Sequence, residues 1–168
     1  GGGRGTLILN QIPSQTAYLQ ALVRHNSSFV KNLSALIEQR ARDNSLGMSI
    51  GENTRIVHCG AIKNVTIGPF SHIHGSQYLE NGTILSCPEH PTEVGEAVSA
   101  KSFIIAEGAK IDSGAVLDKV FAGQAVKMGK QFSAENSMFF ANCEGFHGEA
   151  VSLFAGPYTV THHKSTLL

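Results

Sequence analysis

The stretch IGENTRIVHCGAIKNVTIGPFSHIHG, residues 50–75, places an isoleucine at nearly constant intervals along the chain. The separations are six, six, five and six residues, for Ile50, Ile56, Ile62, Ile67 and Ile73. A helix repeats about every 3.6 residues and a strand every two, so neither accounts for this pattern. An inward side chain at every sixth position suits a coil with three flat faces, each made of a short strand and a corner. Such a coil takes roughly 18 residues a turn, and its turns stack as parallel strands.

The sixfold spacing continues downstream and extends the predicted solenoid over most of the chain. The inward anchors expected in register are Leu79, Leu85, Ile105, Ile111 and Leu117, followed after a three-residue phase shift by Val120, Val126, Phe132 and Met138. The position four residues after an anchor should be small, and it is Thr54, Gly60, Ser71, Thr83, Ala109 and Ala115. The segment SCPEHPTE, residues 86–93, carries two prolines and interrupts the spacing. We predict that this segment is a loop pushed out of the stack.

A β-sandwich with evenly spaced strands is the alternative fold. Sandwich strands alternate inward and outward at every second residue and are commonly joined by hairpin turns. Asn81-Gly82 is the one strong hairpin dipeptide in this part of the sequence. The count in sixes favours the parallel coil.

The N-terminal part of the chain has a helical period instead. From Ser14 to about Asn44, apolar residues recur at intervals of three and four, which predicts two short helices, about residues 15–25 and 28–43. Pro13-Ser14 is a plausible start for the first helix, and Asn26 supplies a second N-cap. We therefore expect a connector over residues 1–13, an α-helical hairpin over 14–47 and a parallel β-helix over 48–168. The two ends of the sequence suggest a segment of a longer protein.

Composition excludes several classes of protein. Hydrophobic residues make up 42% of the chain, which argues against disorder, and 13 basic residues balance 13 acidic ones. This balance argues against a general nucleic-acid surface, which needs an excess of basic residues. No apolar run approaches the roughly 20 residues of a membrane span. The three cysteines are widely spaced and include no CxxC pair, so we expect a cytoplasmic protein without a disulfide framework.

Two stretches resemble the bacterial hexapeptide-repeat proteins: IGENTRIVHCGAIKNVTIG (50–68) and IIAEGAKIDSGAVL (104–117). The resemblance implies a left-handed parallel β-helix, a hand that the spacing itself does not give. Members of this superfamily are mostly acyltransferases that use acyl-CoA or acyl-carrier protein. Others are sugar nucleotidyltransferase domains, and one branch consists of zinc carbonic anhydrases. Because the shared feature is a repeat, it indicates the fold better than the activity.

The segment from Val120 to Leu168 shows a narrower resemblance. It is similar to the middle of a large bacterial family known only as a domain of unknown function, and the similarity extends to the AYLQALVRH helix at 17–25. This resemblance implies more β-helix on both sides of the present chain. It brings no assigned reaction.

The richest polar region lies in CEGFHGEA (143–150) and GPYTVTHHKS (156–165). His147 and Glu149 are two residues apart, so in an extended segment they share one face and could act as a base and its orienting partner. His162 and His163 point to opposite sides of a strand, so one of them at most faces a given site. We take His147, Glu149, His162 and His163 as the catalytic candidates. Histidines on neighbouring coils could alternatively bind zinc, which takes three nitrogens and a water in catalytic sites.

Three further histidines are candidates for a site or for metal binding. His58 and His74 should lie near each other on adjacent turns, because Ile56 and Ile73 are one turn apart, and His72 lies close to the same corner. They could form a base with its partner, metal ligands, or only a hydrogen-bonded surface ladder. His90, in the proline-containing loop with Glu89 and Glu93, could contribute specificity or simply be solvated.

The function expected from these observations is acyl transfer from acetyl-CoA or another acyl-CoA to a sugar or related small molecule. A histidine would act as the general base and backbone N–H groups would stabilise the oxyanion. The alternatives are a metal-dependent, carbonic-anhydrase-like histidine site and a non-catalytic β-helix that scaffolds or binds. We expect a homo-oligomer, a trimer by analogy with the superfamily, that binds neither nucleic acid nor membranes.

Overall fold

The computed structural model describes residues 5–43, 48–162 and 164–168 of the chain. The chain divides into two compact units, Gly1–Gly47 and Met48–Leu168.

The first unit is helical, as the sequence predicts. It contains helix α1 (Ser14–Leu22), the 3-10 turn η1 (Val23–His25) and helix α2 (Ser27–Asp43). The N-cap expected at Asn26 is confirmed, because its side-chain oxygen accepts a hydrogen bond of 3.0 Å from the N–H of Phe29. Gln20 ties the preceding chain to α1 by accepting a bond from the N–H of Leu7 and donating one to its carbonyl, each 3.1 Å long.

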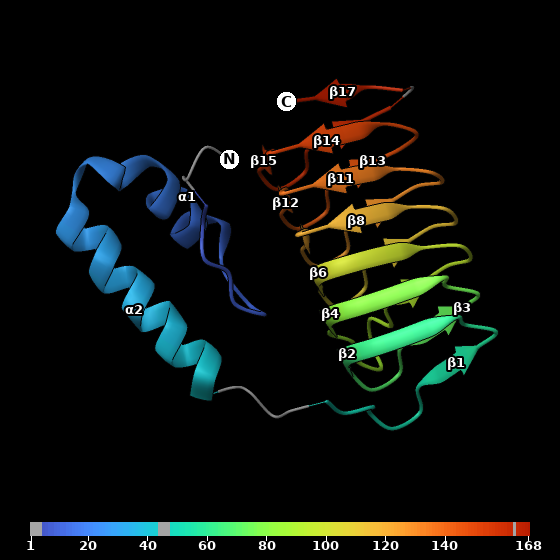
Figure 1. Cartoon of the computed structure of the whole chain (residues 1–168). Coiled ribbons are helices and arrows are strands. Elements are labelled where there is room, and N and C mark those ends of the chain that lie inside the picture. The colour runs from blue at the N-terminus through green and yellow to red at the C-terminus, as the bar shows by residue number, and fades with distance from the viewer. Residues whose placement is uncertain (1–4, 44–47, 163) are drawn as a thin grey trace. The chain divides into compact units, whose positions relative to one another are not determined.

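The second unit is a parallel β-solenoid, in which short strands stack turn upon turn (Figure 1). The first sheet has seven strands: β1 (Arg55–Val57), β3 (His72–His74), β5 (Glu93–Val94), β7 (Lys110–Ile111), β10 (Lys127–Met128), β13 (Glu144–Gly145) and β16 (Val160–Thr161). The second sheet has ten: β2 (Ala61–Ile67), β4 (Tyr78–Ile84), β6 (Ser99–Ile105), β8 (Val116–Asp118), β9 (Phe121–Ala122), β11 (Ser133–Glu135), β12 (Met138–Phe139), β14 (Glu149–Val151), β15 (Phe154–Ala155) and β17 (Thr166–Leu167).

The strand register confirms the parallel coil. Ile56 lies directly beside Ile73, and this pairing, like all those among the described strands, is parallel. The β-sandwich alternative is therefore wrong. Hydrogen-bonded side chains on adjacent turns are 17 residues apart, so a typical turn is one residue shorter than three steps of six.

Most turns lose the residue at the same corner. This corner lies inside the long strands β2, β4 and β6, where Asn64, Asn81 and Ser102 take φ angles of 51°, 53° and 51°. Short polar side chains tolerate this left-handed conformation. The Asn64 amide donates a 2.8 Å hydrogen bond to the Asn81 side-chain oxygen and links two turns. Asn81-Gly82 therefore forms a solenoid corner and no hairpin.

The short corner explains two wrong anchor predictions. Ile84, rather than Leu85, is fully buried, and Phe139, rather than its neighbour Met138, belongs to the core. The core step across this corner is five residues, as from Ile62 to Ile67, so a count in sixes overshoots by one. The first-turn anchors Ile50 and Ile56 are 65% and 37% exposed, because no described turn covers them on one side.

The predicted phase shift after Leu117 is also wrong. Met128 pairs with Ile111, and Ala134 pairs with Leu117, so the register continues unchanged. Val126 and Phe132 are buried as expected. They occupy the partly inward positions between anchors, where earlier turns carry small residues.

The predicted loop is confirmed, with its end one residue earlier. Residues 85–92 form no strand, and Glu93 begins β5. Thr92 anchors the loop from inside the solenoid: it is fully buried, and its hydroxyl donates to the carbonyl oxygens of Leu85 (2.6 Å) and Ala106 (3.1 Å). The same hydroxyl accepts a 3.1 Å bond from the N–H of Gly108. These bonds fix the loop to the following turn.

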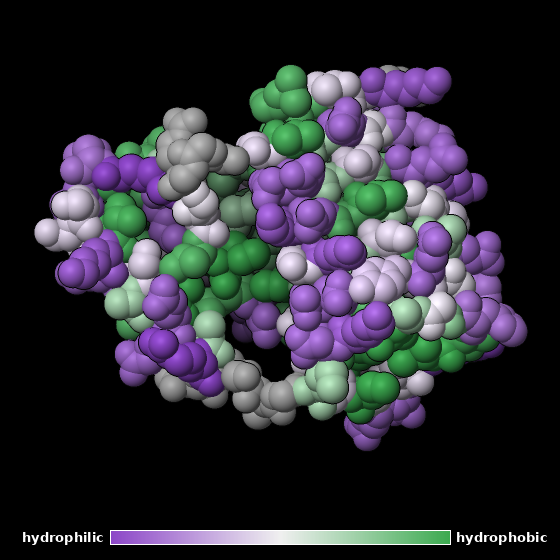
Figure 2. Space-filling model, in the orientation of Figure 1, coloured by the Kyte–Doolittle hydropathy of each residue, from purple (hydrophilic) through white to green (hydrophobic). Residues whose placement is uncertain are grey.

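The outer surface of the solenoid is largely polar. Figure 2 shows hydrophilic side chains over much of the visible face of β2 to β14. Lys63, Glu80, Lys101, Asp118 and Glu135 follow one another there on adjacent strands. In the described part of the chain, no helix is long and apolar enough to cross a membrane.

Candidate functional site

The outer face of the seven-stranded sheet carries two rows of side chains. One residue of each strand points into the core, apolar from Ile56 to Met128 and then Gly145 and Thr161, so the residues before and after it point outward. The first row is Arg55, His72, Glu93, Lys110, Lys127, Glu144 and Val160, and the second is Val57, His74, Gly95, Asp112, Gly129, Phe146 and His162. These rows bring histidines, carboxylates and lysines from successive turns onto one face.

A groove of about 430 Å³ runs along the middle of this face. Its lining includes His72, His74, Glu93, Lys110, Asp112, Lys127 and Phe146, together with Gly95 and Gly129. A volume of this size suits a small molecule.

Two glycines line the groove. Gly95 and Gly129 lie on either side of Asp112 in the second row, where any other residue would project a side chain. The ring of Phe146 lies over Gly129, in the space that a Cβ atom would need. On its other side Phe146 stacks on His162, with 5.0 Å between ring centres and 6° between ring planes. The aromatic pair closes one end of the groove.

Two ion pairs fix the lysines of the first row. Lys110 Nζ lies 2.9 Å from Glu93 Oε1, and Lys127 Nζ lies 2.7 Å from Glu144 Oε1. The lysine side chains are 54% and 53% exposed, so each pair contributes little to stability. Each pair nevertheless neutralises one lysine beside the groove.

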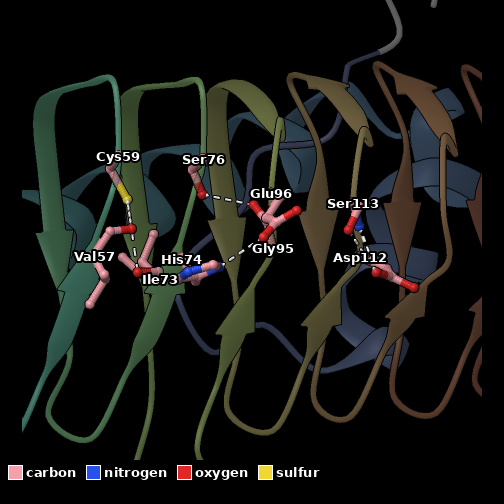
Figure 3. Close-up of polar contacts among 9 residues, drawn as sticks. All are labelled: Val57, Cys59, Ile73, His74, Ser76, Gly95, Glu96, Asp112 and Ser113. Atoms are coloured by element: carbon pink, nitrogen blue, oxygen red, sulfur yellow. Dashed lines mark hydrogen bonds and ion pairs between the residues drawn. The ribbon is translucent and has the colours of Figure 1, made fainter.

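His74 and Glu96 form the most suggestive polar pair. His74 Nδ1 lies 3.3 Å from Glu96 Oε1, and dashed lines mark the contact in Figure 3. Gly75, with a φ of +68°, makes room for it, because a Cβ there would lie 2.8 Å from Glu96 Cγ. This arrangement holds one imidazole nitrogen against a carboxylate at the edge of the groove. The other nitrogen remains for chemistry.

The expected contact between His58 and His74 is present. Their ring centres are 5.9 Å apart and their planes meet at 83°. His58 occupies a corner with φ 55°, and His72 lies in the first row between Arg55 and Glu93. Nowhere in the described ranges do three His, Cys, Asp or Glu side chains converge closely enough to hold a metal ion. The zinc alternative has the His58–His74 contact in its favour and stays a prediction.

The polar region at 143–163 is spread over several faces. His147 is an exposed corner residue with φ 46°, whereas Glu149 begins β14 in the other sheet. No hydrogen bond or ion pair joins these two among the described residues. His162 stacks on Phe146, which lines the candidate groove, and His163 lies outside the described residues.

Cys143 and His90 both make hydrogen bonds with backbone groups of neighbouring turns. Cys143 is buried, its thiol donates a 3.0 Å bond to the carbonyl of Gly156, and burial raises its pKa. A thiol in this state is a poor nucleophile. His90 is exposed at a corner, where its carbonyl accepts a 3.0 Å bond from the N–H of Gly108.

Sequence reasoning did not find Glu96, Asp112 and the two lysines of the groove. The loop makes the step from Ile73 to Val94 21 residues instead of 17, so a constant period does not bring His74 into line with Asp112. Using the loop to correct the period would have aligned the second row.

The whole chain, residues 1–168, matches the family described as Domain of unknown function (DUF4954). The chain belongs to this family. It is also similar to an "Uncharacterized protein" of Treponema pallidum (strain Nichols), with 28% identity over 112 residues. That match covers 66% of this DUF4954 chain and 15% of the relative, so the chain spans a small part of the relative's length. No solved structure matches it.

Proposed function

We propose that this DUF4954 segment holds a small-molecule site for acyl transfer, in which His74 is the general base. The observation that carries the proposal is the 3.3 Å contact between His74 Nδ1 and Glu96 Oε1 at the edge of a groove of about 430 Å³. A carboxylate against one imidazole nitrogen orients the ring.

The reaction requires little of the protein. Nε2 of His74 removes a proton from an acceptor hydroxyl or amine as the acceptor attacks the carbonyl carbon of an acyl thioester. The new bond joins the acceptor to this carbon, the C–S bond breaks, and the proton passes from His74 to the departing thiolate. Acetyl-CoA or another acyl-CoA is the donor implied by the resemblance to hexapeptide-repeat proteins.

His74 suits this role better than the histidines at 143–163. It has a carboxylate partner and lines the groove, while His147 is at a corner and Glu149 lies in the other sheet. His162 supports Phe146 and is retained as a binding residue. His163 is a candidate from the sequence alone.

The left-handed sense of the solenoid and a homotrimer rest on the resemblance alone. The cytoplasmic location rests on the cysteine pattern of the sequence. A groove on the flat outer sheet suits a small sugar-like acceptor, and the non-catalytic alternative uses the same groove for binding only.

The test measures thiol release from acetyl-CoA by the full-length protein with a panel of small hydroxyl and amine acceptors. We expect His74→Gln to lower the rate by at least about 100-fold, since a positioned acid–base group contributes that much or more. Glu96→Gln should lower the rate less. His90→Gln, which alters an exposed corner histidine outside the groove, is the matched control. If the wild-type protein and all the variants bind acceptors but release no thiol, the acyl-transfer proposal is wrong and the non-catalytic binding function is favoured.

A further inference from the structure

Asp112 occupies a distinctive place in the groove. Its neighbours in the second row are Gly95 and Gly129, and the next side chains beyond them are His74 and Phe146. Phe146 fills the space over Gly129, whereas around Gly95 the groove is lined by His74 on one side and Asp112 on the other. With adjacent strands about 4.8 Å apart, these two residues are roughly 10 Å apart along the sheet. One chemical group fits between them.

The charges around this space differ from those of the first row. Both groove lysines are paired with glutamates. Asp112 Oδ1 accepts bonds from the N–H and the hydroxyl of Ser113, at 2.7 and 3.3 Å, as Figure 3 shows. Within the described chain, no Lys, Arg or His lies within ion-pair distance of the Asp112 carboxylate. The uncompensated charge facing the groove is therefore negative.

We propose that the groove takes an amine-bearing acceptor whose ammonium group binds Asp112 beside Gly95. The proposal rests on the acyl-transfer function of His74 and names its substrate class. A carboxylate accepts charge-assisted hydrogen bonds from an ammonium group, and a hydroxyl gains less from the same site. Phe146 packs against the apolar side of the acceptor.

The placement fits N-acylation. The bound ammonium first releases one proton to water, and the free amine then attacks the thioester carbon. The C–N bond forms, the C–S bond breaks, and His74 transfers the second amine proton to the thiolate. The product amide carries no charge, so its attraction to Asp112 is weaker and it can leave.

Calorimetric titration of the full-length protein with glucosamine and with glucose tests the proposal, because the two sugars differ in one amino group. We expect glucosamine to bind at least about tenfold more tightly than glucose, and Asp112→Asn to remove this difference. Asp118→Asn, on the other sheet, is the matched control and should change neither affinity. Equal affinities for the two sugars, no binding of either, or an Asp112→Asn protein that keeps the difference would each overturn the proposal.

Two further variants separate this inference from the proposed function. Gly95→Ala adds a methyl group 3.2 Å from the Ile111 carbonyl oxygen and 3.3 Å from the Ser113 nitrogen, so it should shift the backbone beside Asp112 slightly and weaken glucosamine binding. Unchanged affinity in Gly95→Ala would place the amine elsewhere and overturn the inference. His74→Gln should keep glucosamine binding while acyl transfer is lost. Glucosamine binding without any acyl transfer would refute the catalytic role and leave the amine site standing.

Discussion

Phe146 lies so closely over Gly129 that the ring occupies the position a Cβ atom would take. The two residues directly follow the adjacent strands β13 and β10, and the contact fixes the ring in the plane that stacks on His162. A glycine on one turn therefore sets the orientation of an aromatic side chain on the next.

Gly129→Ala should displace Phe146 and unstack it from His162. Since the ring is at the surface and can swing outward, we expect a small loss in the free energy of unfolding, about 1 kcal/mol, but a clear loss of ligand binding in the groove. Thermal denaturation and calorimetric titration measure the two effects. Gly156→Ala, where a Cβ would meet nothing within 4 Å, is the control. Wild-type binding by Gly129→Ala would show that the ring position does not matter.

Gly82→Ala should be more damaging, because here the neighbouring ring belongs to the closed core. A Cβ at Gly82 would collide with the ring of Phe103, which is 2% exposed and cannot swing into solvent. We expect a loss of about 1–3 kcal/mol, measured by chemical denaturation. The double variant Gly82→Ala/Phe103→Leu should recover part of the stability lost in Gly82→Ala. Two losses that simply add would contradict this account.

Thr92→Val should loosen the loop from the next turn. The substitution keeps the shape of the side chain but removes the hydroxyl that makes three hydrogen bonds inside the solenoid. Unsatisfied buried groups cost about 1–3 kcal/mol each, so the free energy of unfolding should fall by at least that amount. Faster proteolysis within residues 85–92 would report the same change. Thr83→Val, at a half-buried position outside the loop, provides the comparison.

Cys143 should react slowly with thiol reagents and should make stability depend on pH. Burial raises the pKa of its thiol, so the unfolded chain ionises first and stability falls as pH rises above the ordinary thiol pKa of about 8.5. The half-buried Cys59 and Cys87 should be modified before Cys143 under native conditions. Cys143→Ser should remove part of the alkaline loss of stability. Equal modification rates for all three cysteines would contradict the buried placement.

The sequence was sufficient to predict the stacking but not every position within a turn. Isoleucines such as Ile56 and Ile73 mark the inward direction unambiguously, and their pairing is as predicted. After Leu117 the inward residues include Ala122 and Ala134, whose small side chains give no signal against the larger Val126 and Phe132. Hydrophobicity alone then selects Val126 and Phe132 as the anchors. These two residues are also buried, but they lie at the positions between the anchors.

The candidate groove was less accessible to sequence reasoning for a related reason. Contact between His58 and His74 follows from one undisturbed turn, and it is present. Asp112 and Glu96 lie beyond the loop, and Glu96 reaches His74 only because the corner residue Gly75 leaves space. Side-chain direction at a corner depends on the backbone of two turns at once, which spacing does not encode.

The loop at 85–92 also indicates how such a scaffold can change. Its extra residues are absorbed between Ile84 and Val94, both of which keep their partners in the neighbouring turns. Insertions or deletions in this loop would therefore change the outer surface of the solenoid without changing the strand pairing of its core. Members of the family could therefore acquire different loops at this position, and with them different chemistry, on the same solenoid.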